Sequence, residues 1–461
     1  MLRKNLQLIG LVVVTCIAAG CTSAVEDPGR ASWTRVYQQQ EQQKSADSDD
    51  SADMAPELVT LPEILAYAEK NNPGLRAVFD RWTAAVEQVP QAKSLPDPKI
   101  SYAYFLVPVE TRVGPQRQKF GFSQSIPLFG KLGKQGDVAI HGANVAAAHF
   151  ERQRLALRLR VTRLWNDYYY LGRSIAVTEE NVRLMTHLES VALAQYAAGK
   201  TTHAVAIRAQ VELGKLEDQL RTLRDQRKSM TVGLNAELDR PINSMIPWPD
   251  SLEAADLTLT SAELRTLAIH QNPTLTERRA MAARDSAAAD LAGRGPVPNL
   301  VIGAEYIDTG PALDPSMPGS GKNAAVAMAS INVPLWFGQY RAKNSQAHAR
   351  RSASVRELAQ LENQLQADLE RAHFEYRDAD RRVELYAYTL LPKARQSFEV
   401  TEDAFSSGDA SFLDLIDAQR TLLEFELSYE RALADRTTML AQLETIVGQE
   451  LQHNQNEGSA P

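Results

Sequence analysis

Cysteine is nearly absent from this chain, whose two cysteines, Cys16 and Cys21, both lie within the first 21 positions. The rest of the chain therefore has no disulfide framework and no thiolate metal cluster. Basic residues are not in excess either, because 50 Lys and Arg stand against 57 Asp and Glu. The resulting net charge of −7 argues against nucleic acid as a partner, since nucleic acid requires a basic face.

The sequence also lacks the motifs of common catalytic sites. It contains no His-Glu-x-x-His pair, no glycine-rich phosphate loop and no Gly-x-Ser-x-Gly elbow. Its eight histidines are scattered, and none stands three or four positions from another. We therefore expect no enzyme activity, no catalytic residues, no metal site and no cofactor.

Long apolar runs are missing, with one short exception near the start. Basic residues precede an apolar run at 8–19 that is too short for a transmembrane helix, and small residues then precede Cys21. This pattern resembles a bacterial lipobox, in which residues 1–20 form a signal peptide and Cys21 becomes an acylated N-terminus. By that resemblance Thr22 favours the outer membrane. The alternative is an ordinary secretory signal with an incidental cysteine.

After the leader, no apolar run reaches the roughly 18 residues that a membrane-spanning helix needs. A mature chain that crosses a membrane must then do so as a closed β-barrel. Residues 21–57 are polar and end in an acidic segment, so we expect a flexible tether that carries the lipid. Residues 452–461 are expected to be a disordered tail.

The rest of the chain is a tandem duplication, with repeats at 58–240 and 257–451 joined by a proline-rich connection at 241–256. In the first part of each repeat, equivalent residues are 200 positions apart. A longer loop at 309–322 raises the offset to 207 at the junction prolines and to 209 further on. The matched pairs are Thr60 and Thr260, Glu63 and Glu263, Asn72 and Asn272, Pro73 and Pro273, Pro127 and Pro334, Gly199 and Gly408, and Gln210 and Gln419. So many coincidences indicate one continuous structure built from two similar halves. The spacing of Thr60 and Glu63 is that of a capping box.

Each repeat is predicted to contain two strands. They span about 98–109 and 117–126 in the first repeat and about 298–308 and 324–333 in the second. Apolar and aromatic residues alternate with small or polar residues, as in a barrel wall with lipid outside and water inside. The apolar positions are Ile100, Tyr102, Tyr104, Leu106, Phe120, Phe122, Ile126, Leu300, Ile302, Ala304 and Tyr306. A soluble sheet with one wet face is the alternative.

Long helices follow the strands, at about 130–198 and 338–407, and shorter ones return at about 202–236 and 411–448. Each long helix spans about 70 residues, or roughly 100 Å at about 1.5 Å per residue. Apolar residues recur at alternating spacings of four and three, which indicates coiled-coil packing. We expect Pro127 and Pro334 at the strand-to-helix junctions, and Gly199 and Gly408 in the turns at the helix tips.

Four strands are too few to close a membrane barrel, because the smallest has eight. Closure therefore requires several chains, and three chains would supply twelve strands around an open lumen. The fold class expected is mostly α with a membrane β-barrel: long coiled-coil helices forming a tunnel, and four strands per protomer.

This doubled plan, with its junction prolines, its two Asn-Pro pairs and Gly408 followed by Ala418-Gln419, resembles the TolC-like outer-membrane efflux factors. The resemblance covers roughly 58–451. It implies a homotrimeric duct of twelve strands and a helical tunnel, located in the outer membrane and partnered with a periplasmic adaptor and an inner-membrane pump. The segment 113–132 is most similar to members that serve heavy-metal exporters.

The resemblance also implies a periplasmic gate. Family members carry two aspartates six and nine positions after the tip glycine, which correspond here to Asp414 and Asp417. Three chains would bring six carboxylates together, which raises their pKa values and attracts cations. The alternative is a pair of solvated or helix-capping side chains. The arginine that typically stands two positions after the glycine is replaced by Ala410, which puts that closing link in doubt.

Two other functional classes fit part of the pattern. A periplasmic adaptor would share the lipid anchor and the long hairpin, but it would need a compact β-rich domain between the hairpin arms. A lipid-anchored or secreted coiled-coil protein would leave the aromatic strand residues without an apolar environment. Solubility of the unacylated chain without detergent would favour either alternative over a duct.

Overall fold

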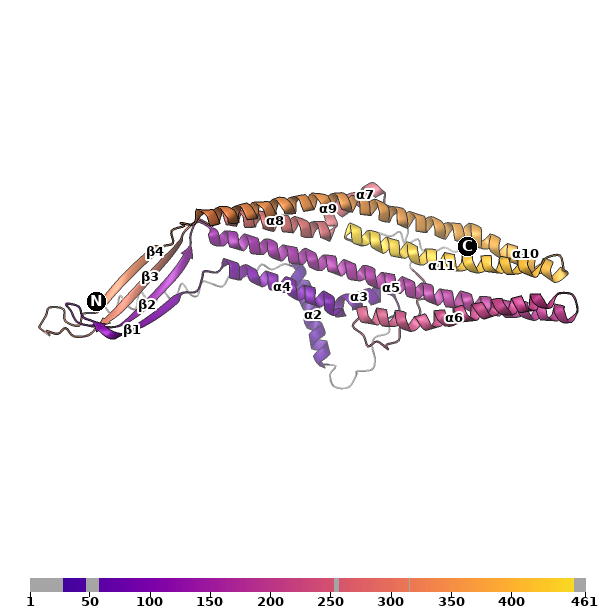
Figure 1. Cartoon of the computed structure of the whole chain (residues 1–461), viewed down its shortest axis with the longest axis horizontal. Helices are drawn as coiled ribbons and strands as arrows, with labels where there is room; N and C mark the ends of the chain where they lie inside the picture. Colours follow the sequence, from indigo (N-terminus) through magenta and orange to yellow (C-terminus); the bar gives the residue numbers. More distant parts are fainter. Residues whose placement is uncertain (1–27, 47–57, 253–256, 315, 452–461) are drawn as a thin grey trace. The chain divides into compact units, whose positions relative to one another are not determined.

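The computed structural model describes residues 28–46, 58–252, 257–314 and 316–451. Across these ranges the chain is mostly helical with one four-stranded sheet, as the sequence predicts for the fold class (Figure 1). Two compact units are present. The sheet unit contains Asp80–Ala148 and Glu277–Ala359, and the hairpin unit contains Ser32–Phe79, His149–Thr276 and the chain from Gln360 onward. No helix in the described ranges is both long and apolar enough to span a membrane.

The elements follow the same order in both repeats. The first repeat consists of α3 (Leu61–Asn71), α4 (Pro73–Lys93), β1 (Lys99–Val109), β2 (Gln116–Pro127), α5 (Lys131–Ala197) and α6 (His203–Glu237). The second consists of α7 (Ser261–Gln271), α8 (Pro273–Gly293), β3 (Asn299–Thr309), β4 (Ala324–Ile331), α9 (Phe337–Leu385), a π-helical turn η2 (Tyr386–Leu390), α10 (Leu391–Ser407) and α11 (Phe412–Val447).

The residues matched between the repeats have matching structural roles. Thr60 and Glu63 form the expected capping box at α3, and Thr260 and Glu263 form the same box at α7. Asn72 accepts a hydrogen bond from the backbone N–H of Leu75 (3.0 Å) and donates to the carbonyl of Glu237 (3.0 Å).

Asn272 repeats this arrangement, with bonds of 2.8 Å to the Leu275 N–H and 2.7 Å to the Ile446 carbonyl. Each asparagine therefore caps the start of one helix and ties it to the end of another. A capping role explains why the Asn-Pro pair occurs in both halves.

The sheet is antiparallel with the strand order β1-β2-β3-β4 (Figure 1). Its register places Tyr102 opposite Phe120 and Phe120 opposite Tyr306, so aromatic side chains share one face. Tyr102 and Phe120 have ring centroids 5.1 Å apart. β1 and β4 are edge strands within the described chain, and each leaves a row of backbone hydrogen-bonding groups open to a further strand.

The two faces of the sheet differ as the alternation predicts. On the apolar face the side chains of Ile100 and Leu106 are 84% and 91% exposed. An exposed apolar surface of this kind marks a site of contact with lipid or with another protein. On the opposite face Lys119 pairs with Glu305 at 2.6 Å across β2 and β3, beside Gly121. Gly121 lies so close to its neighbours that an added Cβ would be 2.4 Å from Ser101 Oγ.

In the hairpin unit, α5 pairs with α6 and α10 with α11 (Figure 1). Residues of the predicted coiled-coil seam are buried, among them Val161 and Tyr168 on α5 and Leu369 and Ala372 on α9. Pro392 lies in the first turn of α10 and follows η2. Proline lacks an N–H and clashes with the preceding turn, so a wider π turn accommodates it within the long helix.

The prediction of a flexible tether over 21–57 is wrong for part of that range. The helix α2 (Pro28–Ala46) occupies its middle. The Tyr37 side chain is 1% exposed and packs on Phe79, with ring centroids 5.0 Å apart, and the Arg76 guanidinium lies 4.4 Å from the Tyr37 ring centre. Trp33 packs on Phe150 at 5.2 Å. These two aromatic anchors give the polar segment a packed attachment that its composition does not reveal.

Candidate gate at the tip turns

Gly199 and Gly408 end the two long helical stretches, at the turns where the chain reverses. Both are in the left-handed region, with φ of +70° and +89°, which glycine adopts without steric cost. Lys200 N–H bonds to the Gln195 carbonyl at 2.9 Å, and Asp409 N–H bonds to the Ala404 carbonyl at 2.8 Å. These are the same six-to-one closing bonds at positions 209 apart, so both tips use one turn design.

A shared apolar core lies behind the two turns. It combines residues from all four hairpin helices: Met185, Leu188, Ala192, Ala209, Leu216, Ala394, Phe398, Phe405, Phe412, Leu415, Ile416 and Leu422. The Phe405 and Phe412 rings lie 5.7 Å apart across the α10–α11 turn. Burial of these apolar side chains therefore stabilises the two tips, and the charged groups described next add to this packing.

Asp414 is part of a capping box at the start of α11. Its carboxylate accepts hydrogen bonds from the Ser411 hydroxyl (2.7 Å) and the Ser411 backbone N–H (3.0 Å), while its own N–H donates to Ser411 Oγ (3.2 Å). The Ser411 hydroxyl, and then its N–H, lower the pKa of Asp414 below its ordinary value. Within one chain, Asp414 is therefore a helix-capping residue, which is the alternative that the sequence left open.

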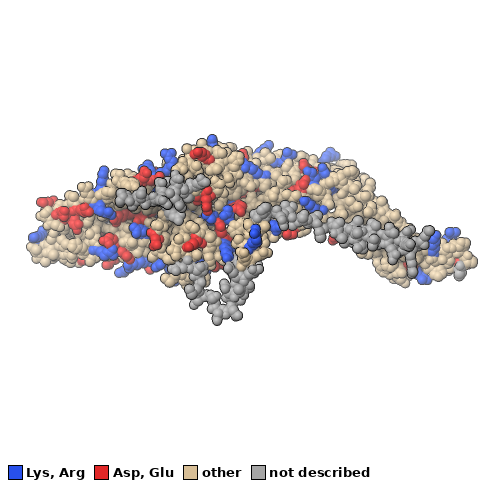
Figure 2. Space-filling view, turned by 180° about the vertical axis from the view of Figure 1, so that it is seen from behind, with Lys and Arg blue, Asp and Glu red and all other residues tan. Residues whose placement is uncertain are grey.

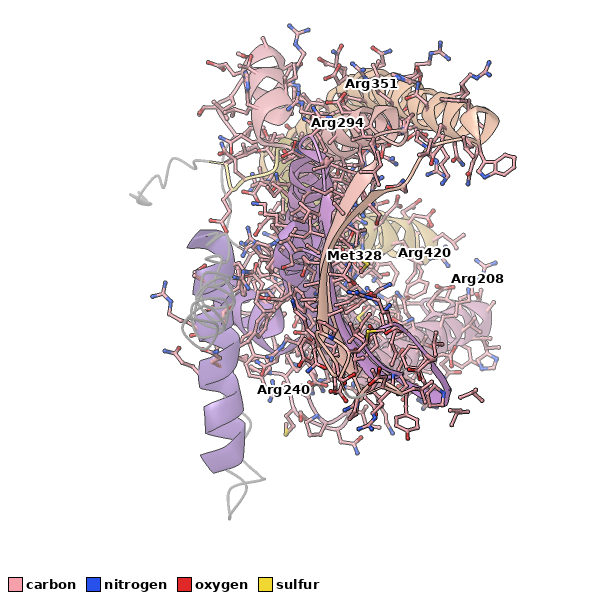
Figure 3. The ribbon with its side chains drawn as sticks, turned by 90° about the vertical axis from the view of Figure 1, so that its left-hand side faces the viewer. Arg208, Arg240, Arg294, Met328, Arg351 and Arg420 are labelled. Carbon is pink, nitrogen blue, oxygen red and sulfur yellow. The ribbon has the colours of Figure 1, made fainter. Side chains whose placement is uncertain are left out.

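Asp417 lies almost one turn further along α11, and its side chain is 76% exposed. Arg420, labelled in Figure 3, lies between two carboxylates. One of its nitrogens is 2.6 Å from Glu212 on α6, and another is 3.9 Å from Asp417. Glu212 also accepts from Lys215 at 2.9 Å. The Arg420 hydrogen bond is the main cause that lowers the pKa of Glu212. Arg420 thus links the two hairpins close to the predicted gate.

The second hairpin is the acidic one of the two. Between Arg395 and Arg420 the sequence has six acidic residues and no Lys, Arg or His: Glu399, Glu402, Asp403, Asp409, Asp414 and Asp417. In the first hairpin, Val205 and Arg208 take the places of Asp414 and Asp417. Figure 2 shows acidic side chains gathered at the hairpin tips. Ala410 stands where family members carry an arginine, so this position of the turn has no positive charge. The basic residue that connects the two hairpins here is Arg420, through Glu212.

The two predicted junction prolines lie next to the strands. Pro127 is the last residue of β2 and faces Asn299 on β3, and Phe129 follows with φ of +54° and its carbonyl bound by Arg294 at 2.7 Å. Pro334 lies between β4 and α9. Cys21 lies outside the described residues. Within the described ranges, no three His, Cys, Asp or Glu side chains are placed to hold a metal ion.

Sequence reasoning missed Ser411, Arg420 and Glu212. Ser411 was recoverable, because Ser411 and Asp414 have the capping-box spacing. The Arg420–Glu212 pair joins residues 208 positions apart, and no local sequence pattern predicts such a contact.

The chain is similar to known proteins along nearly all of its length. A family model described as "Outer membrane efflux protein" matches residues 64–238 and 264–449, which are the two repeats. The cobalt-zinc-cadmium resistance protein CzcC of Cupriavidus metallidurans is 22% identical over 427 residues, which cover 87% of this chain and 95% of that protein.

Solved structures share the fold at lower identity. The outer membrane protein VceC of Vibrio cholerae superposes with a TM-score of 0.71 at 16% identity, over 85% of this chain and 97% of that one. CusC, described in terms of transmembrane channel formation, gives a TM-score of 0.72 at 14% identity, over 87% and 96%. The open state of the MtrE outer membrane channel of Neisseria gonorrhoeae superposes with a TM-score of 0.70 at 16% identity. The match covers 88% of this chain and 95% of that one.

Proposed function

The chain belongs to the outer membrane efflux protein family, and on that premise we propose that three copies form a lipid-anchored exit duct for divalent metal cations. The general function, efflux across the outer membrane through a passive conduit and not an enzymatic reaction, follows from family membership. The trimer, the lipid, the partners and the cargo are the parts that we propose.

The open edges of the sheet support the trimer. β1 and β4 leave their outer backbone groups unpaired within the described chain, and the apolar sheet face is exposed. Joining β4 of one copy to β1 of the next pairs these edges and closes twelve strands into a ring. The apolar faces of Ile100, Tyr102 and Phe120 then meet lipid, and Lys119 and Glu305 line a wet interior.

The acidic tip of the second hairpin supports a cationic cargo. With three copies, Asp414 and Asp417 supply six carboxylates at the periplasmic entrance, which concentrate cations by electrostatic attraction. The similarity to CzcC, named for cobalt, zinc and cadmium resistance, agrees with this assignment. We propose that a periplasmic adaptor and an inner-membrane pump deliver the metal, and that the acyl chains on Cys21 hold each copy in the outer membrane.

The experiment that tests the cargo is deletion of the gene, followed by growth on graded cobalt, zinc, cadmium and copper salts, and on dyes and detergents. We expect sensitivity to the divalent metals to rise and tolerance of dyes and detergents to remain, with plasmid-borne wild-type protein restoring growth. Sensitivity confined to dyes and detergents would refute the metal assignment and keep the duct. A Cys21→Ser variant that restores growth fully would show that the lipid is dispensable.

A further inference from the structure

The first five turns of α9 carry unbalanced positive charge. Between Phe337 and Arg356 there are five Lys or Arg residues, one histidine and no Asp or Glu. The five are Arg341, Lys343, Arg350, Arg351 and Arg356. All five side chains are exposed, and none has an ion pair within the described part of the chain (Figure 3 labels Arg351). Such a surface attracts anions from solution.

The acidic groups nearest to this stretch are already occupied by other partners. Glu357 pairs with Arg278 on α8 at 3.2 Å. Asp285 accepts from Arg284 at 2.9 Å through one oxygen and from the Ser354 hydroxyl through the other. Glu357 and Asp285 therefore form their ion pairs with arginines of α8 and none with the five basic side chains of α9.

A hollow of about 240 Å³ lies between α8 and α9 at this point. We call it the α8–α9 hollow. It is lined by Arg278, Met281, Arg284, Asp285, Arg350, Ala353, Ser354 and Glu357. Three arginines thus meet two carboxylates, and Arg350 is the arginine whose charge is unmatched. Lys343, seven positions before Arg350, lies on the same face of α9 and extends the positive surface.

We propose that the α8–α9 hollow binds an oxyanion of the phosphate type, with Arg350 as its principal contact. A guanidinium presents paired N–H donors that match two phosphate oxygens, which a lysine does not reproduce. Arg278 and Arg284 border the same space, and Asp285 and Glu357 leave the hollow with one positive charge, which attracts an anion. The phosphate belongs either to a small solute or to a lipid headgroup, since both present the same oxygens.

Isothermal titration of the detergent-purified full chain with inorganic triphosphate tests this proposal. We expect saturable binding at low ionic strength that weakens as salt is added. Arg350→Gln should weaken it at least fivefold, and Arg350→Lys should restore only part of it. Arg341→Gln is the matched control, because this residue is an equally exposed and unpaired arginine of α9 outside the hollow, and binding should stay within twofold of wild type.

Absence of binding to the wild-type chain at low salt would overturn the proposal, as would equal losses for Arg350→Gln and Arg341→Gln. Repeating the titration in phosphatidylglycerol and in phosphatidylcholine vesicles identifies the source of the phosphate. Competition by phosphatidylglycerol points to a lipid headgroup, and equal affinity in both vesicles points to a free solute. The readout is binding and not conduction, so it is independent of whether the duct and its cargo are assigned correctly.

Discussion

At the scale of single residues, Asp414 caps α11 through Ser411 within one chain. In the trimer that we propose, Asp414 and Asp417 would form an acidic ring at the entrance. The two roles are separable, because an asparagine side chain still accepts a hydrogen bond but carries no charge. The sequence alone placed both aspartates by resemblance, while the capping bonds required the folded turn.

Replacing both Asp414 and Asp417 by Asn should raise single-channel conductance and weaken block by multivalent cations. The helix cap is retained, so the effect reports on charge and not on unfolding of the tip. The measurement is conductance in planar bilayers, with increasing amounts of a trivalent cation on the periplasmic side. Glu402→Gln together with Asp403→Asn is the matched control, since it removes two charges from α10. Unchanged conductance and block in the Asp414/Asp417 variant would remove the gate from this account.

The lowered pKa values of Asp414 and Glu212 set the direction of the pH dependence. A carboxyl whose pKa is lower in the folded chain stabilises the fold above its unfolded value of about 4. That contribution disappears as the pH falls through the lower, folded value. We expect conductance to be constant from pH 7 to about pH 5 and to rise below about pH 4. A rise centred near pH 6 would show that crowding of the six carboxylates in the trimer outweighs the capping bonds within each chain.

At the scale of secondary-structure elements, the sequence predicted the helices and strands well where the apolar pattern repeats over many residues. The α5 seam and the strand alternation are local patterns, and both reappear as buried and exposed faces. The helix α2 escaped prediction because Trp33 and Tyr37 are two aromatic residues in an otherwise polar segment, and their partners lie tens of positions away. The contacts between hairpins escaped for the same reason.

The Arg420–Glu212 pair is the testable link between the hairpins. Exposed ion pairs contribute about 0–1 kcal/mol, so Arg420→Gln should leave the thermal midpoint nearly unchanged. It should nevertheless raise single-channel conductance, because it releases α11 from α6 near the entrance. Arg183→Gln is the matched control: Arg183 pairs with Glu180 within α5 alone. Equal conductance of the two variants would mean that Arg420 does not hold the tip.

A second set of polar contacts joins α5 to α11 above the tip. The buried carboxylate of Glu430 accepts from the Tyr169 hydroxyl at 3.0 Å and from Arg173 at 2.8 Å. Burial, and then the Glu430 charge, raise the pKa of Tyr169 to about 12, so it remains a donor at all physiological pH values. Further along the same helices Asn166 donates to the Thr438 hydroxyl at 2.9 Å.

Removing the Tyr169 hydroxyl should therefore destabilise the hairpin unit. Tyr169→Phe leaves a buried carboxylate oxygen without its donor, which costs about 1–3 kcal/mol. Tyr170→Phe on the same helix is the control, because its ring lies beside Arg431 (5.3 Å) and that contact does not need the hydroxyl. Thermal unfolding followed by circular dichroism should show a lower midpoint for Tyr169→Phe only. Equal midpoints would show that the buried pair contributes no net stability.

At the scale of the whole molecule, the chain is built from two similar halves that together supply four strands. Four strands with two open edges, an exposed apolar face and long helices with wet sides fit a structure that other copies complete. The sequence supplied the duplication and the strand count, and these already exclude a closed barrel from one chain. The number of copies cannot be read from either repeat, because it depends on surfaces that meet only in the assembly.

The central claim, that copies of this chain enclose a conducting duct, is tested most directly by adding the detergent-purified full chain to a planar lipid bilayer. We expect discrete, uniform conductance steps that are larger when Asp414 and Asp417 are both replaced by Asn. A bilayer that stays insulating with a chain shown to be folded by circular dichroism would contradict it.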